Sequence, residues 1–436
     1  MNAAALTDGE PSFIQEDHLR SGTDEEQSIQ RLVYVTFTMN DVYDEAVMAR
    51  AFTEYARRHS SYHAQYVKCD RGYRARYIEP EQMELEVVAT SESNGPGVTA
   101  KDYLQSGLPG LDEWSSFAFG VTGIESARAD SAAPQFTVLI AADHLFTDAI
   151  SLSISFYELV SRYSALRAGR EYVSPPVRSY RDFSNEQRAR ARALSPDHPE
   201  VTRWREIVRR AGGMPRFPLP LGVEPGRGAA PQIAVETAFL DPDRVAAFAA
   251  AAKRCGGAMG SALLAVQAEL ERELTGSDLF TMMAPRSHRP DPTDLMAVGW
   301  YITLVPVQFS TEGDFPTLVR AAHQALATAR ELERLPVFPV IDVLRDDPEF
   351  PVEHGFDAPM LSYIDITRTP GAELARSHDV SIFANATPMR EVYMWINRDA
   401  GGLDFRAMYP GNPTAESSVQ TYFTLLRDRL GELSNA

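Results

Sequence analysis

A histidine and an aspartate, four residues apart, directly follow an apolar run and precede a helical pattern. The run, residues 136–142, is β-branched and apolar with almost no alternation, which is typical of a strand covered on both faces. A neutral imidazole, with a reference pKa of about 6.5, takes a proton from an alcohol or amine near pH 7 and returns it to a leaving group. We therefore predict that His144 is a general base and that Asp148 orients the turn.

A long helix is expected directly after this turn. Its apolar residues recur at steps of three and four: Leu152, Phe156, Leu159, Tyr163 and Leu166. This spacing predicts about five turns, and Gly169 is the expected stop. A histidine between such a strand and such a helix has a fixed position. The HxxxD spacing alone is weak, because nine histidines give about 0.6 chance matches. From these residues alone, His144 is a base or a hydrogen-bonded core histidine.

Length and composition describe an ordinary globular protein. The chain has 436 residues, which suits two lobes of about 200 residues each, with 44% hydrophobic and 23% charged residues. The net charge of −18, without a dense Lys/Arg block, disfavours binding to nucleic acid or to anionic membranes. No apolar stretch is long enough to span a bilayer and the first 30 residues lack a leader pattern, so we expect a cytoplasmic protein.

The pattern of elements and breakers divides the chain into four parts. Residues 1–28 contain few large apolar groups and are expected to be loose. An N-terminal lobe with the HxxxD motif is predicted over 29–178, and a connection rich in proline and glycine over 179–232. A C-terminal lobe, 233–436, again opens with a strand, two helices and a strand.

Neither metal nor cysteine chemistry is indicated. Cys69 and Cys255 are too few for a disulfide framework and have no metal-ligand spacing. His59 and His63 have the i, i+4 spacing of metal ligands, but no carboxylate ligand is obvious near them in the sequence. We expect no metal site and no tightly bound cofactor.

Several stretches occur in the order of a known superfamily. Asp143-His-Leu-Phe-Thr-Asp-Ala149 is similar to the motif HHxxxDG. Residues 177–187 resemble the tyrosine–aspartate–glutamine stretch at the start of the inter-lobe linker, 289–306 resemble the arginine and G-[FW]-[FY]-x-N-T-L-P strand, and 403–409 resemble a late strand. The chain thus resembles the condensation-domain superfamily of acyltransferases. This superfamily includes peptide-synthetase condensation domains, chloramphenicol acetyltransferase-like enzymes and stand-alone polyketide-associated acyltransferases. Residues 217–222 make the last group the most similar.

The resemblance implies a fold and a reaction. The fold is α/β (α+β), with two chloramphenicol acetyltransferase-like lobes in a V and a central tunnel that has His144 at its base. The reaction moves an acyl group from a thioester, carried on coenzyme A or on the phosphopantetheine arm of an acyl or peptidyl carrier protein, to an alcohol or amine. The product is an ester or amide of polyketide, nonribosomal-peptide or lipid biosynthesis.

The resemblance also implies partners within the site. Asp148 pairs with an arginine of the second lobe, which is Arg289 by its spacing to Gly299, with Arg286 as the fallback. The candidates for lining the tunnel are Asp143, Ala149, Trp300, Thr303 and Trp395.

Three positions depart from the family pattern. Asp143 replaces the first histidine, Ala149 replaces the glycine, and Thr303 replaces an asparagine. Asp143 and Ala149 motivate one alternative, a catalytically silent condensation-like domain that docks a carrier protein or an oxygenase. A third interpretation is a two-lobed binding protein with a core histidine. Because His144 and Asp148 are both retained at the turn, we favour the acyltransferase.

Overall fold

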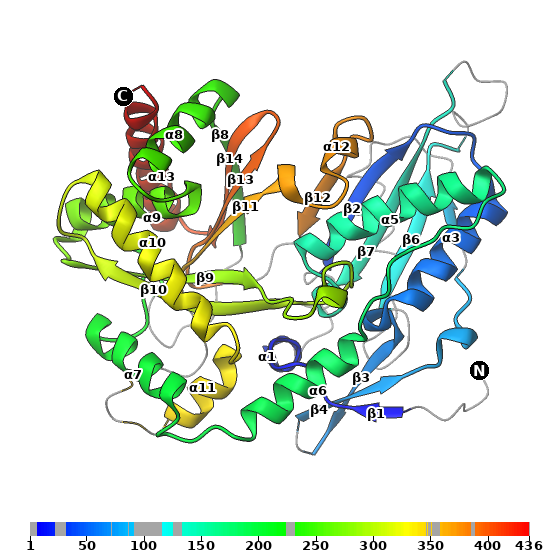
Figure 1. Cartoon of the computed structure of the whole chain (residues 1–436), viewed down its shortest axis with the longest axis horizontal. Coiled ribbons are helices and arrows are strands. Elements are labelled where there is room, and N and C mark those ends of the chain that lie inside the picture. Colours follow the sequence, from blue (N-terminus) through cyan, green and yellow to red (C-terminus); the bar gives the residue numbers. More distant parts are fainter. Residues whose placement is uncertain are drawn as a thin grey trace. The chain divides into compact units, whose positions relative to one another are not determined.

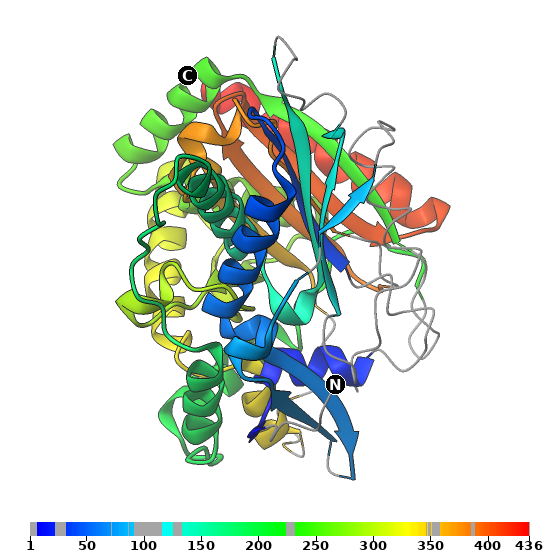
Figure 2. The same cartoon turned by 90° about the vertical axis from the view of Figure 1, so that its right-hand side faces the viewer.

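The structure, a computed structural model, consists of two compact units (Figures 1 and 2). It describes residues 7–21, 32–70, 72–85, 87–90, 116–124, 133–223, 232–345, 347, 350, 358–384 and 389–435. Unit 1 comprises Met1–Arg190, Arg289–Ile302 and Arg368–Asn385, and unit 2 comprises Ala191–His288, Thr303–Thr367 and Ala386–Ala436. Each unit is therefore assembled from segments that are distant in the sequence, rather than from one continuous range.

Unit 1 is built on a five-stranded sheet in the order β12-β2-β7-β6-β5. Its strands are β12 (Ser381–Ala384), β2 (Leu32–Met39), β7 (Phe136–Asp143), β6 (Phe117–Thr122) and β5 (Val88–Thr90). The strand predicted over residues 136–142 is thus confirmed as β7, which pairs antiparallel with both β2 and β6. Because β12 pairs with β2, the segment Arg368–Asn385 belongs to unit 1.

Two helices cover one face of this sheet (Figure 1). They are α3 (Glu45–Arg58) and α5 (Ala149–Arg167), and both begin at an aspartate whose carboxylate accepts a hydrogen bond from the backbone of the first turn. Phe52 of α3 and Phe156 of α5 pack with Val138 and Ile140 of β7 in one buried cluster. Pairing within the sheet therefore fixes β7, which precedes His144, and packing on the sheet fixes α5, which follows it.

The N-terminal segment is ordered where the structure describes it. β1 (Thr7–Gly9) joins a three-stranded sheet with β4 (Gly72–Tyr77) and β3 (Ala64–Cys69), and α1 (Phe13–Ser21) follows. The expectation of a loose segment over 1–28 is wrong for these residues, because Leu19 and Gln15 of α1 are buried. The remainder of that range lies outside the described residues.

Unit 2 contains a six-stranded sheet in the order β10-β9-β11-β13-β14-β8. The strands are β8 (Gln232–Leu240), β9 (Leu279–Ser287), β10 (Ile302–Ser310), β11 (Met360–Asp365), β13 (Tyr393–Asp399) and β14 (Gly402–Pro410). β11 is parallel to β9 and β13, whereas β14 is antiparallel to β13 and β8. The helices are α7 (Pro199–Ala211), α8 (Pro242–Arg254), α9 (Met259–Thr275), α10 (Phe315–Leu332), α11 (Val337–Leu344) and α13 (Pro413–Ser434).

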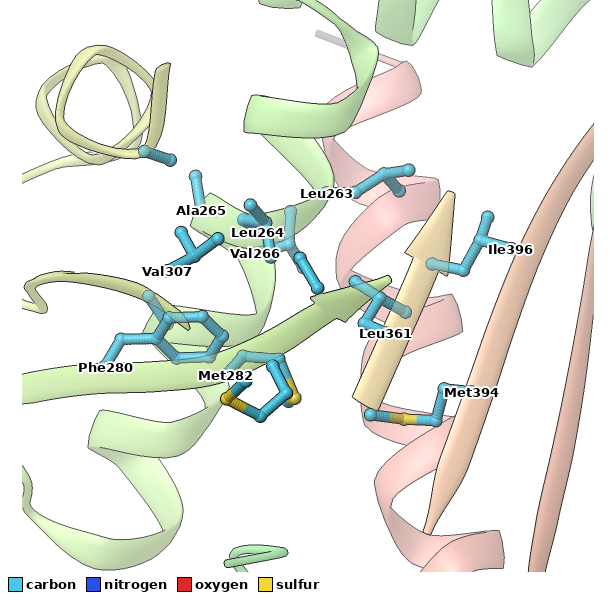
Figure 3. Packing of buried hydrophobic residues seen from close by; sticks show 14 of the residues in the cluster. Leu263, Leu264, Ala265, Val266, Phe280, Met282, Val307, Leu361, Met394 and Ile396 are labelled. Carbon is cyan, nitrogen blue, oxygen red and sulfur yellow. The ribbon is translucent and has the colours of Figure 1, made fainter. Parts of the chain in front are cut away.

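The interior of unit 2 is apolar where its helices meet its sheet. Figure 3 shows Leu263 and Val266 of α9 close to Phe280 of β9, Val307 of β10 and Leu361 of β11. Each buried aliphatic or aromatic side chain of this kind stabilises the fold by about 1.5–3 kcal/mol relative to an exposed one. Burial of these side chains therefore stabilises the packing of the helices on the sheet.

The range 179–232, predicted as the connection between the lobes, contains two helices, and its residues 224–231 lie outside the described part of the chain. It contains α6 (Tyr180–Ala191), which lies in unit 1 up to Arg190, and α7, which lies in unit 2. The remaining short helices are η2 (Ser60–His63), η3 (Pro80–Gln82), η5 (His144–Phe146), η6 (Pro292–Asp294), η7 (Ile366–Arg368) and α12 (Ala372–Ala375). Within the described part of the chain, no helix has the length and apolar character that crossing a bilayer demands.

Candidate active site

The predicted turn joins β7 to α5 through a short 3₁₀ helix, η5, which begins at His144. The carboxylate of Asp143 accepts the backbone N–H of Leu145 at 2.9 Å, and that of Asp148 accepts the backbone N–H of Ser151 at 2.7 Å. Each aspartate thus satisfies a free donor at the start of a helix. The predicted five-turn helix is confirmed, with Ala149 exposed at its first position.

One ring nitrogen of His144 is enclosed by the protein. The residue as a whole is partly exposed, and its Nδ1 atom is buried without a hydrogen bond to another described residue. Burial lowers the pKa of His144 to about 4, and the charge of His18 lowers it further, against smaller opposing effects of Asp148 and Asp143. The imidazole is therefore neutral at pH 7, the state that a general base requires.

A buried ion pair anchors the turn through Asp148. Its side chain is 1% exposed, and Nη2 of Arg289 lies 3.4 Å from its Oδ1 atom. The backbone N–H of Tyr301 donates to the other carboxylate oxygen at 2.9 Å. The pairing expected from spacing is therefore present, whereas the fallback, Arg286, pairs with Glu333 at 2.8 Å. A buried pair of this kind fixes orientation more than it adds stability.

Arg289 also folds its own segment around the start of α5. Nη1 donates to the carbonyl oxygens of Asp294 at 2.7 Å and Ala297 at 2.6 Å. Nη2 donates to the hydroxyl of Ser151 at 2.9 Å, and the guanidinium lies 4.2 Å from the centre of the Tyr301 ring. One arginine thus connects the segment Arg289–Ile302 to the turn that carries His144.

The same segment brings Trp300 against the ring of His144. Its indole stacks on His144 with ring centres 4.0 Å apart and planes at 28°. The hydroxyl of Ser151 donates to the backbone carbonyl of Gly299 at 2.8 Å. The hydroxyl of Tyr180 donates to the backbone carbonyl of Trp300, also at 2.8 Å. The Tyr180 ring is so close that a Cβ atom on Gly299 would lie 2.2 Å from it. Glycine is therefore required for this approach.

Helix α1 supplies contacts that the sequence did not predict. The side-chain amide of Gln15 donates to the carbonyl of Leu145 at 2.7 Å. Nε2 of His18 lies 2.9 Å from Oδ1 of Asp143, and the edge of its ring meets the Trp300 indole at 5.1 Å and 89°. Asp143, which replaces the motif's first histidine, therefore binds a histidine from elsewhere in the chain.

The other two tunnel candidates belong to unit 2. Thr303 is buried on β10, and Trp395 is partly buried on β13. Their expected position along a tunnel stays a prediction.

A second buried polar cluster joins α5 to the end of α3. Glu158 contacts His59 at 3.1 Å, Arg58 at 3.2 Å and Arg162 at 2.6 Å. Burial alone would raise the pKa of Glu158, but these three groups together lower it to about 2. The sequence showed no carboxylate near His59, yet the fold brings one from 99 residues away. The described residues contain no cluster of three or more histidines, cysteines or acids arranged for a metal ion.

Comparisons with known proteins extend over most of the chain. Residues 12–349 match the family described as the condensation domain. The chain is 26% identical over 438 residues to trehalose-2-sulfate acyltransferase PapA2 of Mycobacterium tuberculosis (strain H37Rv), covering 97% of this chain and 89% of that protein. It is also 26% identical over 436 residues to acyltransferase PapA3 of the same strain, with the same coverage.

Solved structures share the fold. A structure of PapA2 acyl transferase matches with a TM-score of 0.86 at 24% identity, covering 100% of this chain and 93% of that chain. The condensation domain of the Monacolin K polyketide synthase MokA matches with a TM-score of 0.76 at 14% identity, covering 99% of both chains. The expected mixed α/β fold of the chloramphenicol acetyltransferase-like type is therefore confirmed.

Proposed function

The chain belongs to the condensation-domain family and is an acyltransferase, and we propose that it moves an acyl group from a thioester to a hydroxyl or amine with His144 as the general base. The observation that carries the proposal is the state of this imidazole. Its pKa is lowered to about 4, so it is neutral at pH 7, and it lies on a turn fixed by Asp148 and Arg289. A neutral imidazole in a fixed position is what proton abstraction requires.

In the proposed reaction, the acceptor hydroxyl or amine attacks the thioester carbonyl while Nε2 of His144 removes its proton. A C–O or C–N bond forms, and the carbonyl becomes a tetrahedral oxyanion. This intermediate collapses with cleavage of the C–S bond, and the imidazolium returns the proton to the departing thiol. The products are an ester or amide and a free thiol, and His144 is neutral again. Asp148 remains paired with Arg289 throughout and keeps the turn in place.

General base catalysis of this kind contributes a factor of about 10²–10⁴ to the rate. Alignment of the two substrates and stabilisation of the oxyanion supply the remainder. The contacts of Trp300, Ser151 and Gly299 around the turn serve this alignment, because they restrict the positions that the His144 ring can adopt.

We propose a hydroxyl group as the acceptor and therefore an ester as the product. Two relatives support this choice by name: PapA2 is a trehalose-2-sulfate acyltransferase, and PapA1 of Mycobacterium bovis is a 2'-acyl-2-O-sulfo-trehalose (hydroxy)phthioceranyltransferase. The proposed donor is an acyl chain on the phosphopantetheine thiol of coenzyme A or of an acyl or peptidyl carrier protein, which is consumed as substrate. The proposed site of action is the cytoplasm.

The test is a panel of acyl-coenzyme A and acyl-carrier thioesters, each combined with sugar alcohols, simple alcohols and amines. Thiol release and product mass are followed with the wild-type protein and with His144→Ala. We expect release that needs both an acceptor and His144. If neither protein transfers any acyl group, the proposal fails, and carrier-protein capture by the full chain becomes the test of the docking alternative.

A further inference from the structure

The second imidazole beside His144 has a fixed place in the fold. Nε2 of His18 lies 2.9 Å from Oδ1 of Asp143, and the exposed fractions of the two side chains are 14% and 3%. The centres of the His18 and His144 rings are 6.4 Å apart. Asp143 also accepts the backbone N–H of Leu145, so the carboxylate that holds His18 is part of the catalytic turn itself.

Trp300 connects the two imidazoles. One face of the indole stacks on His144 at 4.0 Å, and the ring of His18 meets the indole edge-on at 5.1 Å. A stacked or edge-on aromatic contact contributes about 0.5–1.5 kcal/mol beyond the area that it buries. Each ring therefore limits the rotation of its neighbour, and a change at His18 reaches His144 through Trp300 and through Asp143.

Helix α1 is held firmly enough to place His18. Gln15 donates to the carbonyl of Leu145 at 2.7 Å and to the hydroxyl of Tyr66 at 2.7 Å, and its side chain is buried. The hydroxyl of Ser12 lies 3.0 Å from that of Tyr180, whose hydroxyl also holds the Trp300 carbonyl. The helix is therefore attached both to the turn and to the segment that carries the indole.

We propose that His18 is a positioning residue for acyl transfer: its imidazole, fixed by Asp143, holds the Trp300 indole against His144 and lies with its own ring centre 6.4 Å from that of the catalytic ring. The inference rests on the proposed function of His144 as the base. Asp143, at the first position of the motif, supplies a carboxylate. The imidazole bound to it belongs to His18, 125 residues earlier in the chain.

The charges around His144 support this role. Asp143 and Asp148 lie on the same turn and favour the protonated form of the ring, and Arg289 pairs with Asp148. His18 on α1 is the group whose charge opposes protonation. A positive charge on His18 therefore works against protonation of His144.

The experiment compares His18→Gln with the wild-type full-length protein. Glutamine retains a donor for Asp143 but removes both the aromatic ring and the charge. Arg20→Ala is the matched control, because it removes a positive charge from the same helix at a residue that is 57% exposed and pairs with Glu16. Two quantities are measured: kcat/KM as a function of pH, and the titration of the His144 ring by NMR of histidine-labelled protein, with its signal assigned from His144→Ala.

We expect His18→Gln to lower kcat/KM about 10-fold at pH 7, through loss of orientation. The acid limb of its pH–rate profile and the midpoint of the His144 titration should both move up by about one pH unit, because the positive charge of His18 is removed from the neighbourhood of His144. Arg20→Ala should leave both unchanged. Lower activity with an unmoved acid limb and titration would make His18 a structural anchor only and overturn the proposal. So would wild-type behaviour of His18→Gln.

Failure of the proposed function gives a different pattern. If His144→Ala keeps its turnover, His144 is not the base, yet the NMR titration still measures whether His18 controls protonation of that ring. If the midpoint of the His144 titration moves in His18→Gln, the electrostatic coupling between the two histidines is supported. If the midpoint does not move, the coupling is contradicted.

Discussion

The two units contain the same kind of strand-to-helix junction, and the difference between these junctions shows what the proposed catalytic turn adds to an ordinary one. In unit 1, β7 leads to α5, and Asp148 accepts the N–H of Ser151 at 2.7 Å. In unit 2, β14 leads to α13, and Asn412 accepts the N–H of Ala415 at 3.0 Å. Both side chains satisfy a free donor at the start of a long helix. Local sequence is sufficient for this step.

The junctions differ in what reaches them from elsewhere. Asn412 is neutral and partly exposed, and its amide donates to the carbonyl of Leu221 at 2.9 Å. Asp148 is buried and charged, and it pairs with Arg289 and with the backbone of Tyr301. A helix cap becomes part of a site when distant segments supply a counter-charge and fix the neighbouring imidazole.

The largest expected effect comes from exchanging the two caps. Asp148→Asn retains a cap but leaves the buried Arg289 without its carboxylate, so we expect a loss of about 3–5 kcal/mol in unfolding free energy. Acyl transfer should fall with it. Asn412→Asp is the reciprocal control and should cost about 1 kcal/mol, mainly for the lost hydrogen bond to Leu221. Urea denaturation measures both, and equal costs would contradict the distinction between the two junctions.

A smaller effect is expected from adding a methyl group at Gly299, in the segment Arg289–Ile302. In Gly299→Ala the new Cβ would meet the Tyr180 ring at 2.2 Å, so the segment carrying Trp300 has to move. We expect a loss of about 1–3 kcal/mol in stability and reduced acyl transfer. Gly431→Ala on α13 is the control, because no atom lies within 4 Å of its Cβ position and a helical alanine is favoured. Wild-type stability and activity in Gly299→Ala would show that the contact is unimportant.

The smallest expected effect is that of mild acid on the reaction. The pKa of His144 is lowered to about 4, so the neutral ring is the dominant form above that value and is lost only as the pH falls through it. We expect kcat/KM to be nearly constant from pH 8 to about pH 5 and to fall below about pH 4. The pH–rate profile with a neutral alcohol acceptor measures this. An acid limb near pH 6.5 would mean that burial does not control the base.

The local elements of the site could be predicted from the sequence because each depends on a short pattern. The apolar run identified β7, and the periodicity after Asp148 identified α5. Arg289 was found through the motif's spacing to Gly299, and the structure places it 3.4 Å from the carboxylate.

The contribution of α1 could not be predicted by the same means, since its contacts join residues far apart in the chain. A local signal was nevertheless present: Ser12 and Gln15 form a capping box, in which the N–H of Ser12 donates to the side chain of Gln15 at 2.8 Å. That box indicates a helix, but not that His18 will meet Asp143. Glu158 is a similar case, because only the packing of α3 against α5 brings it to His59.

The most direct test of the central claim is the rate of acyl transfer by His144→Ala, measured beside His323→Ala. His323 is exposed on α10, so its substitution removes a histidine without touching the turn. With both variants shown to be folded by circular dichroism, we predict that His144→Ala lowers kcat by a factor of about 10²–10⁴ and that His323→Ala retains the wild-type rate. Near-wild-type transfer by His144→Ala would contradict the account, because the reaction would then not depend on this base.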